Sequence, residues 1–238
     1  MKKHMGLKMI ELHLSARING VFIGKIENRW PDKPSSAIQK NEVFGSQNIL
    51  LAGLEKDAQA DLAVHGGPDK ALHHYAADHY PFWQAKNQMP SGTIPAAFGE
   101  NISTIGLTEE NLCIGDILRL GSALVQISQG RQPCWKLGHH TGNAKMPKLF
   151  QTTGRTGWYY RVLEVGQVSP LDTITLIERP NPDWTVKFVT QARLTRSLNT
   201  WQASILANLP ELAKSWRNAF AKIAEGNHDE DTSARLKG

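Results

Sequence analysis

The segment SQGRQPCWKLGHH, residues 128–140, places one of the chain's two cysteines between basic side chains. Cys134 follows Arg131 and precedes Lys136, and cations beside a thiol favour the thiolate, the form that attacks electrophiles or binds soft metals. Cys113 lies instead among strand-type apolar residues in NLCIGDIL, with no adjacent cation, and we interpret it as a packing residue. Three interpretations of Cys134 stay open at this point. It is a metal ligand, a nucleophile assisted by one of the nine histidines, none of which the sequence singles out, or a small apolar residue that packs where a strand passes into a loop.

A second cluster surrounds two consecutive glycines in VHGGPDKALHHY, residues 64–75. Gly66 and Gly67 allow the backbone to take a positive φ or to approach a ligand closely, and Lys70 adds a positive charge beside the turn. Such a turn can hold an anion. The alternative is a tight connection between two strands, which needs the same glycines.

Four histidines, His65, His73, His74 and His79, lie in and after this turn. Neutral imidazole is a common metal ligand, so a metal site built from them has to be considered. The sequence has no HExxH pattern, and a strand over residues 71–75 would point His73 and His74 to opposite faces. The pattern therefore argues against a site made of histidines alone.

Two further loops carry polar groups. In FGENIST, residues 98–104, the Asn101 amide offers donors and an acceptor, which suits the edge of a heterocycle; the alternative is a loop side chain that bonds to its own backbone. In QTTGRTGWYY, Arg155 stands between two glycines. It is either a second anion contact or an exposed arginine in a hairpin turn.

The elements that must position these groups are mostly strands. Alternating residues in MIELHLSARI, and later short apolar runs separated by turn residues, predict a mainly β barrel or sandwich over about residues 8–181, interrupted by a helix near residues 77–86. From Pro182 to Gly226 the apolar spacing becomes helical and predicts a small C-terminal domain of three helices. The charged stretch 227–238 has few apolar residues, and we predict that it is disordered.

Composition limits the classes of function. A net charge of +5 favours anionic partners, but the cations are scattered, without a nucleic-acid motif, so we expect no nucleic acid polymer. No segment has the apolar length of a signal peptide or a membrane span, so we expect no membrane association. Two cysteines cannot build a framework of several disulfides, which favours a reducing, cytoplasmic location.

Five segments, in this order, resemble the MOSC domain family. They are KPSSAI at 33–38, VHGGPDKAL at 64–72, FGENIST at 98–104, IGDILRLG at 114–121 and SQGRQPCWKL at 128–137. Within that family the chain is most similar to the YiiM-like proteins. The resemblance implies a mainly β fold: a MOSC-type β-barrel with a few helices, followed by the small three-helix domain.

The resemblance also implies a molybdenum cofactor of the molybdopterin type, with the metal ligated by one cysteine, here Cys134. Basic residues and turn amides at matching or nearby loop positions are then expected to bind the cofactor, and these are Gly66, Gly67, Lys70, Asn101, Arg131 and Arg155. The implied activity is reduction of small N-hydroxylated compounds, such as hydroxylaminopurine, with electrons from a separate flavoprotein. Among groups that can donate a proton we favour a histidine of residues 65–79, with His65 as the catalytic candidate.

Several alternatives remain open beside this interpretation. The protein could bind and deliver the cofactor or a sulfur species without turnover. The helical domain could dock the electron donor, pack against the barrel or form a homodimer. Two departures from the family pattern affect the backbone: Gly130 replaces a usual proline, which predicts a more flexible approach to Arg131, and Lys56 replaces a usual glycine.

Overall fold

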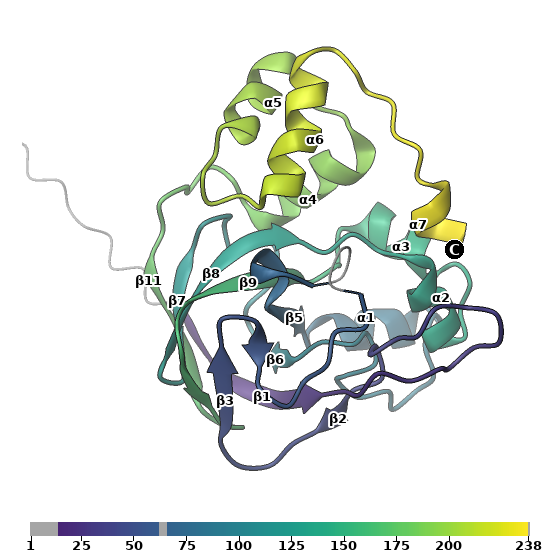
Figure 1. Ribbon diagram of the computed structural model, residues 1–238, viewed down its shortest axis with the longest axis vertical. Coiled ribbons are helices and arrows are strands. Elements are labelled where there is room, and N and C mark those ends of the chain that lie inside the picture. Colours follow the sequence, from purple (N-terminus) through teal and green to yellow (C-terminus); the bar gives the residue numbers. More distant parts are fainter. Residues whose placement is uncertain (1–13, 62–65, 238) are drawn as a thin grey trace, which may run out of the picture.

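The computed structural model describes residues 14–61 and 66–237, and its largest element is a closed barrel (Figure 1). Eight strands form one sheet in the order β11-β7-β8-β9-β5-β6-β1-β2, and the additional pairing of β11 with β1 closes it around seven of them. All pairs are antiparallel except β5 with β6. The strands are β1 Ser15–Ile23, β2 Asn41–Glu42, β5 Leu72–Ala76, β6 Ile102–Thr104, β7 Ile117–Leu120, β8 Ala123–Gly130, β9 Trp158–Glu164 and β11 Thr173–Glu178. The predicted barrel is confirmed.

A smaller sheet and several short helices complete the barrel domain. The small sheet has the order β10-β3-β4, with β10 Gly166–Val168, β3 Gln47–Leu50 and β4 Gly53–Leu54. The helices are the 3-10 turn η1 Pro68–Lys70, α1 His79–Ala85, α2 Trp135–Thr141 and α3 Met146–Thr153. The sequence predicted only α1. Helices α2 and α3 have only 7 and 8 residues, which is too short for a clear helical repeat of apolar residues in the sequence. Each ends at a glycine in the left-handed conformation, Gly142 and Gly154.

Three further helices follow and pack on the barrel: α4 Val186–Thr195, α5 Thr200–Ala207 and α6 Lys214–Ala224. Buried side chains of the barrel, such as Val125, and of the helices, such as Val189 and Phe220, belong to one continuous apolar cluster. A Cβ added at Gly130 would lie 1.8 Å from Thr190 Oγ1. Gly130 therefore allows α4 to approach the end of β8, and close packing, rather than the predicted flexibility, accounts for it.

Residues after α6 turn back toward the barrel (Figure 1). We predicted disorder for residues 227–238, whereas the structure ties residues 227–230 to Arg193 and Arg196 at the C-terminal end of α4 and ends in a short helix, α7 Ser233–Lys237. Ion pairs hold this stretch, which apolar content alone does not reveal. The limits 8–181 and 182–226 stay predictions, and no helix of the described ranges has both the length and the apolar character needed to span a membrane.

Candidate functional site

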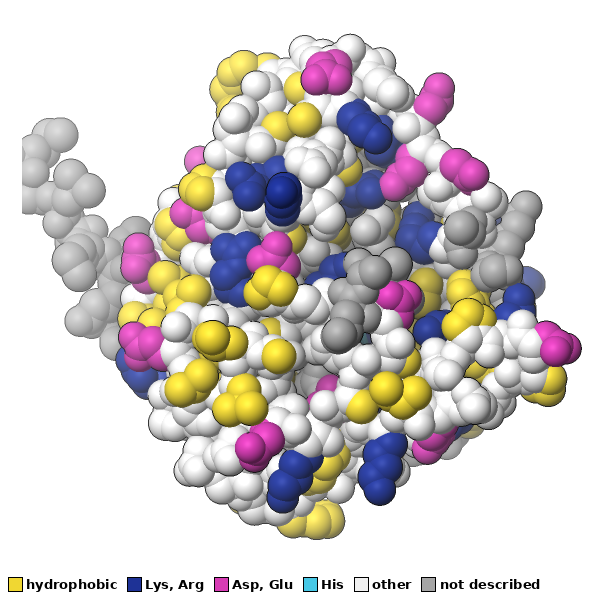
Figure 2. All heavy atoms as spheres, in the orientation of Figure 1, with side chains coloured by type: hydrophobic (Ala, Val, Ile, Leu, Met, Phe, Trp, Pro, Cys, Tyr) yellow, Lys and Arg dark blue, Asp and Glu magenta, His cyan; other side chains and the backbone are white. Residues whose placement is uncertain are grey.

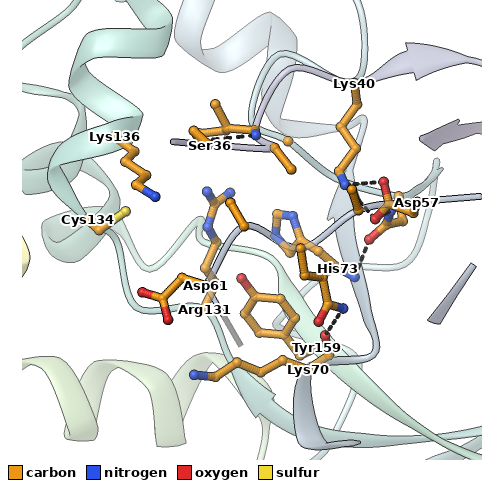
Figure 3. Close-up of a pocket in the computed structure, with 17 residues that line it drawn as sticks. Ser36, Lys40, Asp57, Asp61, Lys70, His73, Arg131, Cys134, Lys136 and Tyr159 are labelled. Atoms are coloured by element: carbon orange, nitrogen blue, oxygen red, sulfur yellow. Dashed lines mark hydrogen bonds and ion pairs between the residues drawn. The ribbon is translucent and has the colours of Figure 1, made fainter. Parts of the chain in front are cut away.

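A pocket opens where β5, β8 and β9 meet the loops around residues 36–40 and 57–61 (Figure 3). Its empty volume, which includes the open mouth, is about 610 Å³. The structure brings four of the predicted site residues together in its lining: Lys70, Asn101, Arg131 and Cys134. Segments far apart in the sequence therefore meet at one site, as the predicted set required.

Cys134 lies at the turn between β8 and α2. The strand ends at Gly130, residues 131–133 cross the edge of the pocket, and Cys134 is the N-cap residue of α2 in an extended conformation. Only 8% of the cysteine is exposed, and its sulfur lies on the pocket side near Lys136 (Figure 3). Lys136 also lines the pocket and donates a hydrogen bond to the carbonyl of Ser35 at 3.0 Å. The thiol is thus presented beside a fixed cation.

The charges in the pocket are mainly positive. Of the described residues, four cations line it against two carboxylates: Lys40, Lys70, Arg131 and Lys136 against Asp57 and Asp61. Arg131 is held by a hydrogen bond of 2.5 Å from Nη1 to the carbonyl of Phe98. Burial lowers the pKa of Lys70, although the neighbouring carboxylates of Asp69 and Asp61 oppose the shift. A pocket of this charge and shape suits an anionic ligand.

One wall of the pocket is a buried ion pair. Lys40 Nζ lies 2.6 Å from both carboxylate oxygens of Asp57, and both side chains are more than nine-tenths buried. Asn101 Nδ2 donates to Asp57 at 2.8 Å and to the Phe22 carbonyl at 3.2 Å, while its oxygen accepts from the His73 backbone at 3.0 Å. Asn101 is therefore in the pocket wall, but its amide holds the wall together.

His73 and His74 lie on opposite faces of β5, as the alternation of a strand requires. His74 is hydrogen-bonded on both ring nitrogens, to Tyr160 Oη at 3.0 Å and Thr104 Oγ1 at 2.9 Å. His73 lines the pocket and packs at 5.1 Å against the Tyr159 ring. Among the residues that the structure describes, neither of its buried ring nitrogens has a hydrogen-bond partner. Burial, and after it the charge of Arg131, keeps the pKa of His73 well below the usual value. The nearby Gly99 backbone raises this pKa only in part, because the contact lacks good hydrogen-bond geometry. His73 is thus a neutral imidazole.

Other predicted residues lie elsewhere. Gly66 and Gly67 precede η1 and are not in the pocket lining; Gly67 has a φ of 91°, and a Cβ there would meet nothing, so its backbone angle explains the glycine. The Arg155 guanidinium stacks over Phe82, 4.0 Å from the ring centre, and is also outside the lining. His65 falls outside the described residues.

Sequence reasoning missed much of the pocket wall. Lys40, Asp57 and Tyr159 were not predicted as site residues, although Tyr159 stands in the segment QTTGRTGWYY and Asp57 follows Lys56 of the family comparison. The strand alternation around His73 was a usable signal. The second departure from the family pattern has no visible consequence, since Lys56 is exposed and is not among the residues with positive φ.

Comparison with known proteins identifies the family. The MOSC domain model matches residues 61–175. Protein YiiM of Escherichia coli (strain K12) is 40% identical over 219 residues, which cover 92% of this chain and 97% of that protein. The chain belongs to the MOSC family. A solved structure of E. coli YiiM covers 94% of this MOSC chain and 100% of its own, with a TM-score of 0.78 and 34% identity.

Two other relatives widen the comparison. YflK, an uncharacterized protein of Bacillus subtilis (strain 168), is 42% identical over 190 residues, or 80% of this MOSC chain and 85% of that one. A protein named Reductase from Gibberella moniliformis is 39% identical over 193 residues, which are 80% of this chain but only 33% of that longer protein.

MOSC domains are generally associated with the molybdenum cofactor, and the donor set of this pocket fits such a group. Among the described residues, no group of three or more His, Cys, Asp and Glu side chains is arranged to hold a metal ion. The pocket instead offers one thiol, several cations and a buried imidazole without a partner. Such a set fits a metal that arrives in an anionic organic cofactor and takes a single protein ligand.

Proposed function

We propose that this MOSC protein uses a molybdenum cofactor to reduce small N-hydroxylated compounds of the hydroxylaminopurine type, with electrons from a separate flavoprotein. The observation that carries the proposal is the position of Cys134, the thiol that faces a cationic pocket. Family membership and similarity to a protein named Reductase support redox chemistry at this site.

In this proposal Cys134 is the one protein ligand of molybdenum. Arg131 and Lys136 bind the phosphate of the cofactor, because both stand close to Cys134 in the sequence and line the same pocket. The Lys40–Asp57 pair keeps the opposite wall in place. When bound, the cofactor supplies a two-electron redox centre.

Reduction of an N-hydroxyl group breaks the N–O bond, takes up two electrons and two protons, and yields the amine and water. The reduced flavoprotein supplies the electrons, and the pocket has to deliver the protons. His73 is neutral, and burial raises the pKa of Tyr159, so neither group readily gives up a proton near neutral pH. Burial lowers the pKa values of Lys40 and Lys70.

We therefore assign proton delivery to Lys70, because it is only partly buried and can regain a proton from solvent, whereas the Lys40 side chain is more than nine-tenths buried. For the described histidines of residues 65–79, this assignment replaces the proton-donor role that we predicted from the sequence. His65 stays a prediction.

Turnover tests the proposal. Cofactor-loaded protein is mixed with a reduced flavoprotein or an artificial electron donor and hydroxylaminopurine, and the amine product is measured against donor oxidised. We expect one amine for each two electrons consumed, and a fall of kcat by about 10²-fold or more in Lys70→Met with cofactor content retained. Full loading without any turnover of N-hydroxylated substrates would contradict the reductase and favour a cofactor carrier.

A further inference from the structure

The segment that follows α6, residues 227–237 and here called the tail, is tied to α4 by two arginines. Arg196 donates from Nε and Nη2 to the backbone carbonyls of His228 and Asn227, at 2.6 and 2.8 Å. Arg193 forms a two-bond ion pair with the Glu230 carboxylate, at 2.7 and 2.6 Å. Because two parallel charge-assisted hydrogen bonds fix both distance and direction, the tail has a defined path over the helix.

The far end of the tail reaches the turn that carries Cys134. Arg235 Nη1 donates a hydrogen bond of 2.6 Å to the carbonyl oxygen of Pro133. Leu236 lies in a hollow that Trp135 and His139 of α2 also line. The tail therefore contacts both the residue before Cys134 and the helix after it, although Arg235 and Pro133 are 102 positions apart in the sequence.

The electrostatics agree with this placement. Burial lowers the pKa of Arg235, and the charges of Glu230 and Cys134 oppose the shift. Arg235 is absent from the lining of the pocket, so it approaches the turn from the outer side. It thus acts on Cys134 through the backbone and not as a ligand contact.

We propose that Arg235 is a positioning residue for Cys134, and that the tail, anchored on α4, fixes the peptide unit between Pro133 and Cys134. The Pro133 carbonyl and the Cys134 nitrogen belong to the same planar group, so a hydrogen bond to that oxygen restricts the orientation of the plane on which Cys134 is mounted. Pro133 has no N–H to anchor the turn from its own side. The helical domain thereby gains a role at the site through Arg193 and Arg196.

This inference concerns the protein itself and does not require the proposed reductase activity. It is tested on the full-length, cofactor-free protein by alkylation with iodoacetamide, an uncharged reagent, followed by mass spectrometry of each cysteine. The variants are Arg235→Gln, which removes the contact, and Glu230→Gln, which releases the tail but keeps Arg235. Lys222→Gln is the matched control, because this α6 lysine is exposed and the same charge is lost.

We expect both tail variants to raise the alkylation rate of the largely buried Cys134, by about tenfold for the loss of a hydrogen bond to a charged group. Cys113, buried elsewhere, serves as an internal reference, and its rate stays unchanged, as do both rates in the control. Slower alkylation in Arg235→Gln with no change in Glu230→Gln would mean that Arg235 acts on the thiol only by charge, and would overturn the proposal. Equal acceleration at both cysteines would also overturn it, because the tail would then stabilise the whole fold.

A second readout uses protein loaded with the cofactor. Molybdenum is measured after repeated gel filtration, and both tail variants are expected to lose it faster than the Lys222→Gln control. Unchanged retention beside unchanged alkylation would refute the positioning role. If the protein takes up no molybdenum at all, the proposed function fails while the alkylation result still decides the role of Arg235.

Discussion

The pocket and the barrel core each contain one cysteine and one histidine of β5, and the two pairs differ in their partners. In the core, Cys113 donates to the Pro182 carbonyl at 3.5 Å, and His74 is bonded on both ring nitrogens. In the pocket, Cys134 faces cations, and neither ring nitrogen of His73 has a hydrogen-bond partner within residues 14–61 and 66–237. The same side chains are thus packing groups in one region and available groups in the other.

This difference shows that the role of a buried Cys or His is better indicated by whether its polar atoms have hydrogen-bond partners than by its residue type. A buried polar group without a partner lowers stability, so a fold that keeps one has a reason outside its own packing. His73 is such a group, in the pocket that also contains Cys134. The predictions below test whether the two regions differ as their bonding indicates.

The largest effect is expected from replacing the two histidines by leucine. His74→Leu leaves the buried hydroxyls of Tyr160 and Thr104 without this partner and should reduce the free energy of unfolding by about 2 to 5 kcal/mol. His73→Leu removes two unpartnered nitrogens, so its cost should be within about 1 kcal/mol of zero. Urea unfolding of the cofactor-free protein at pH 7 measures both, and equal losses would mean that His73 has a structural partner.

Acid should reveal what the two histidines share, which is burial. Burial lowers the pKa of His74 from 6.5 to about 3 and that of His73 well below 6.5, so below pH 6.5 the unfolded chain binds protons that the folded chain does not. Stability therefore falls as the pH drops from 6.5 toward 4, by at most about 1.4 kcal/mol per pH unit for each histidine. Urea unfolding at a series of pH values measures this slope. Each leucine variant should lack the contribution of the histidine that it replaces, and a variant with the slope of the wild-type protein would refute the assigned burial effect.

The smallest effect in this series concerns the cysteines. Burial raises the pKa of Cys113 to about 11, so at pH 8 only about one molecule in a thousand has this thiol ionised. Cys134 lines an open pocket beside cations and should be alkylated at least about tenfold faster in the cofactor-free protein. Mass spectrometry of the two labelled peptides gives the ratio, and a faster Cys113 would reverse the comparison between the regions.

The features that could be predicted from the sequence are the elements with a regular apolar pattern and the residues that lie in recognisable motifs. The barrel, the C-terminal helices and the strand leading to Cys134 follow from periodicity, whereas α1 follows from helix-start residues, Asp78 and Pro81. The opposite directions of His73 and His74 follow from their adjacency in a strand. Lys70, Arg131 and Cys134 were predicted together because their segments match one family.

Residues without a local signal were missed. Lys40 and Asp57 form the pocket wall only because two loops meet there, and their spacing in the chain has no regular period. The tail was predicted to be disordered because it lacks apolar residues, whereas Arg193 and Glu230, 37 positions apart, hold it by charge. Contacts between distant loops depend on the completed barrel, which a linear pattern does not specify.

The central claim is that Cys134 is the protein ligand of a molybdenum cofactor, and metal analysis tests it most directly. Wild-type protein and the variants Cys134→Ser and Cys113→Ser are purified from a host that makes the cofactor, and molybdenum and pterin fluorescence are measured on each. The account predicts about one molybdenum atom per chain in the wild type and in Cys113→Ser, and loss of both signals in Cys134→Ser. Wild-type protein without molybdenum, or Cys134→Ser protein that retains it, would contradict the account.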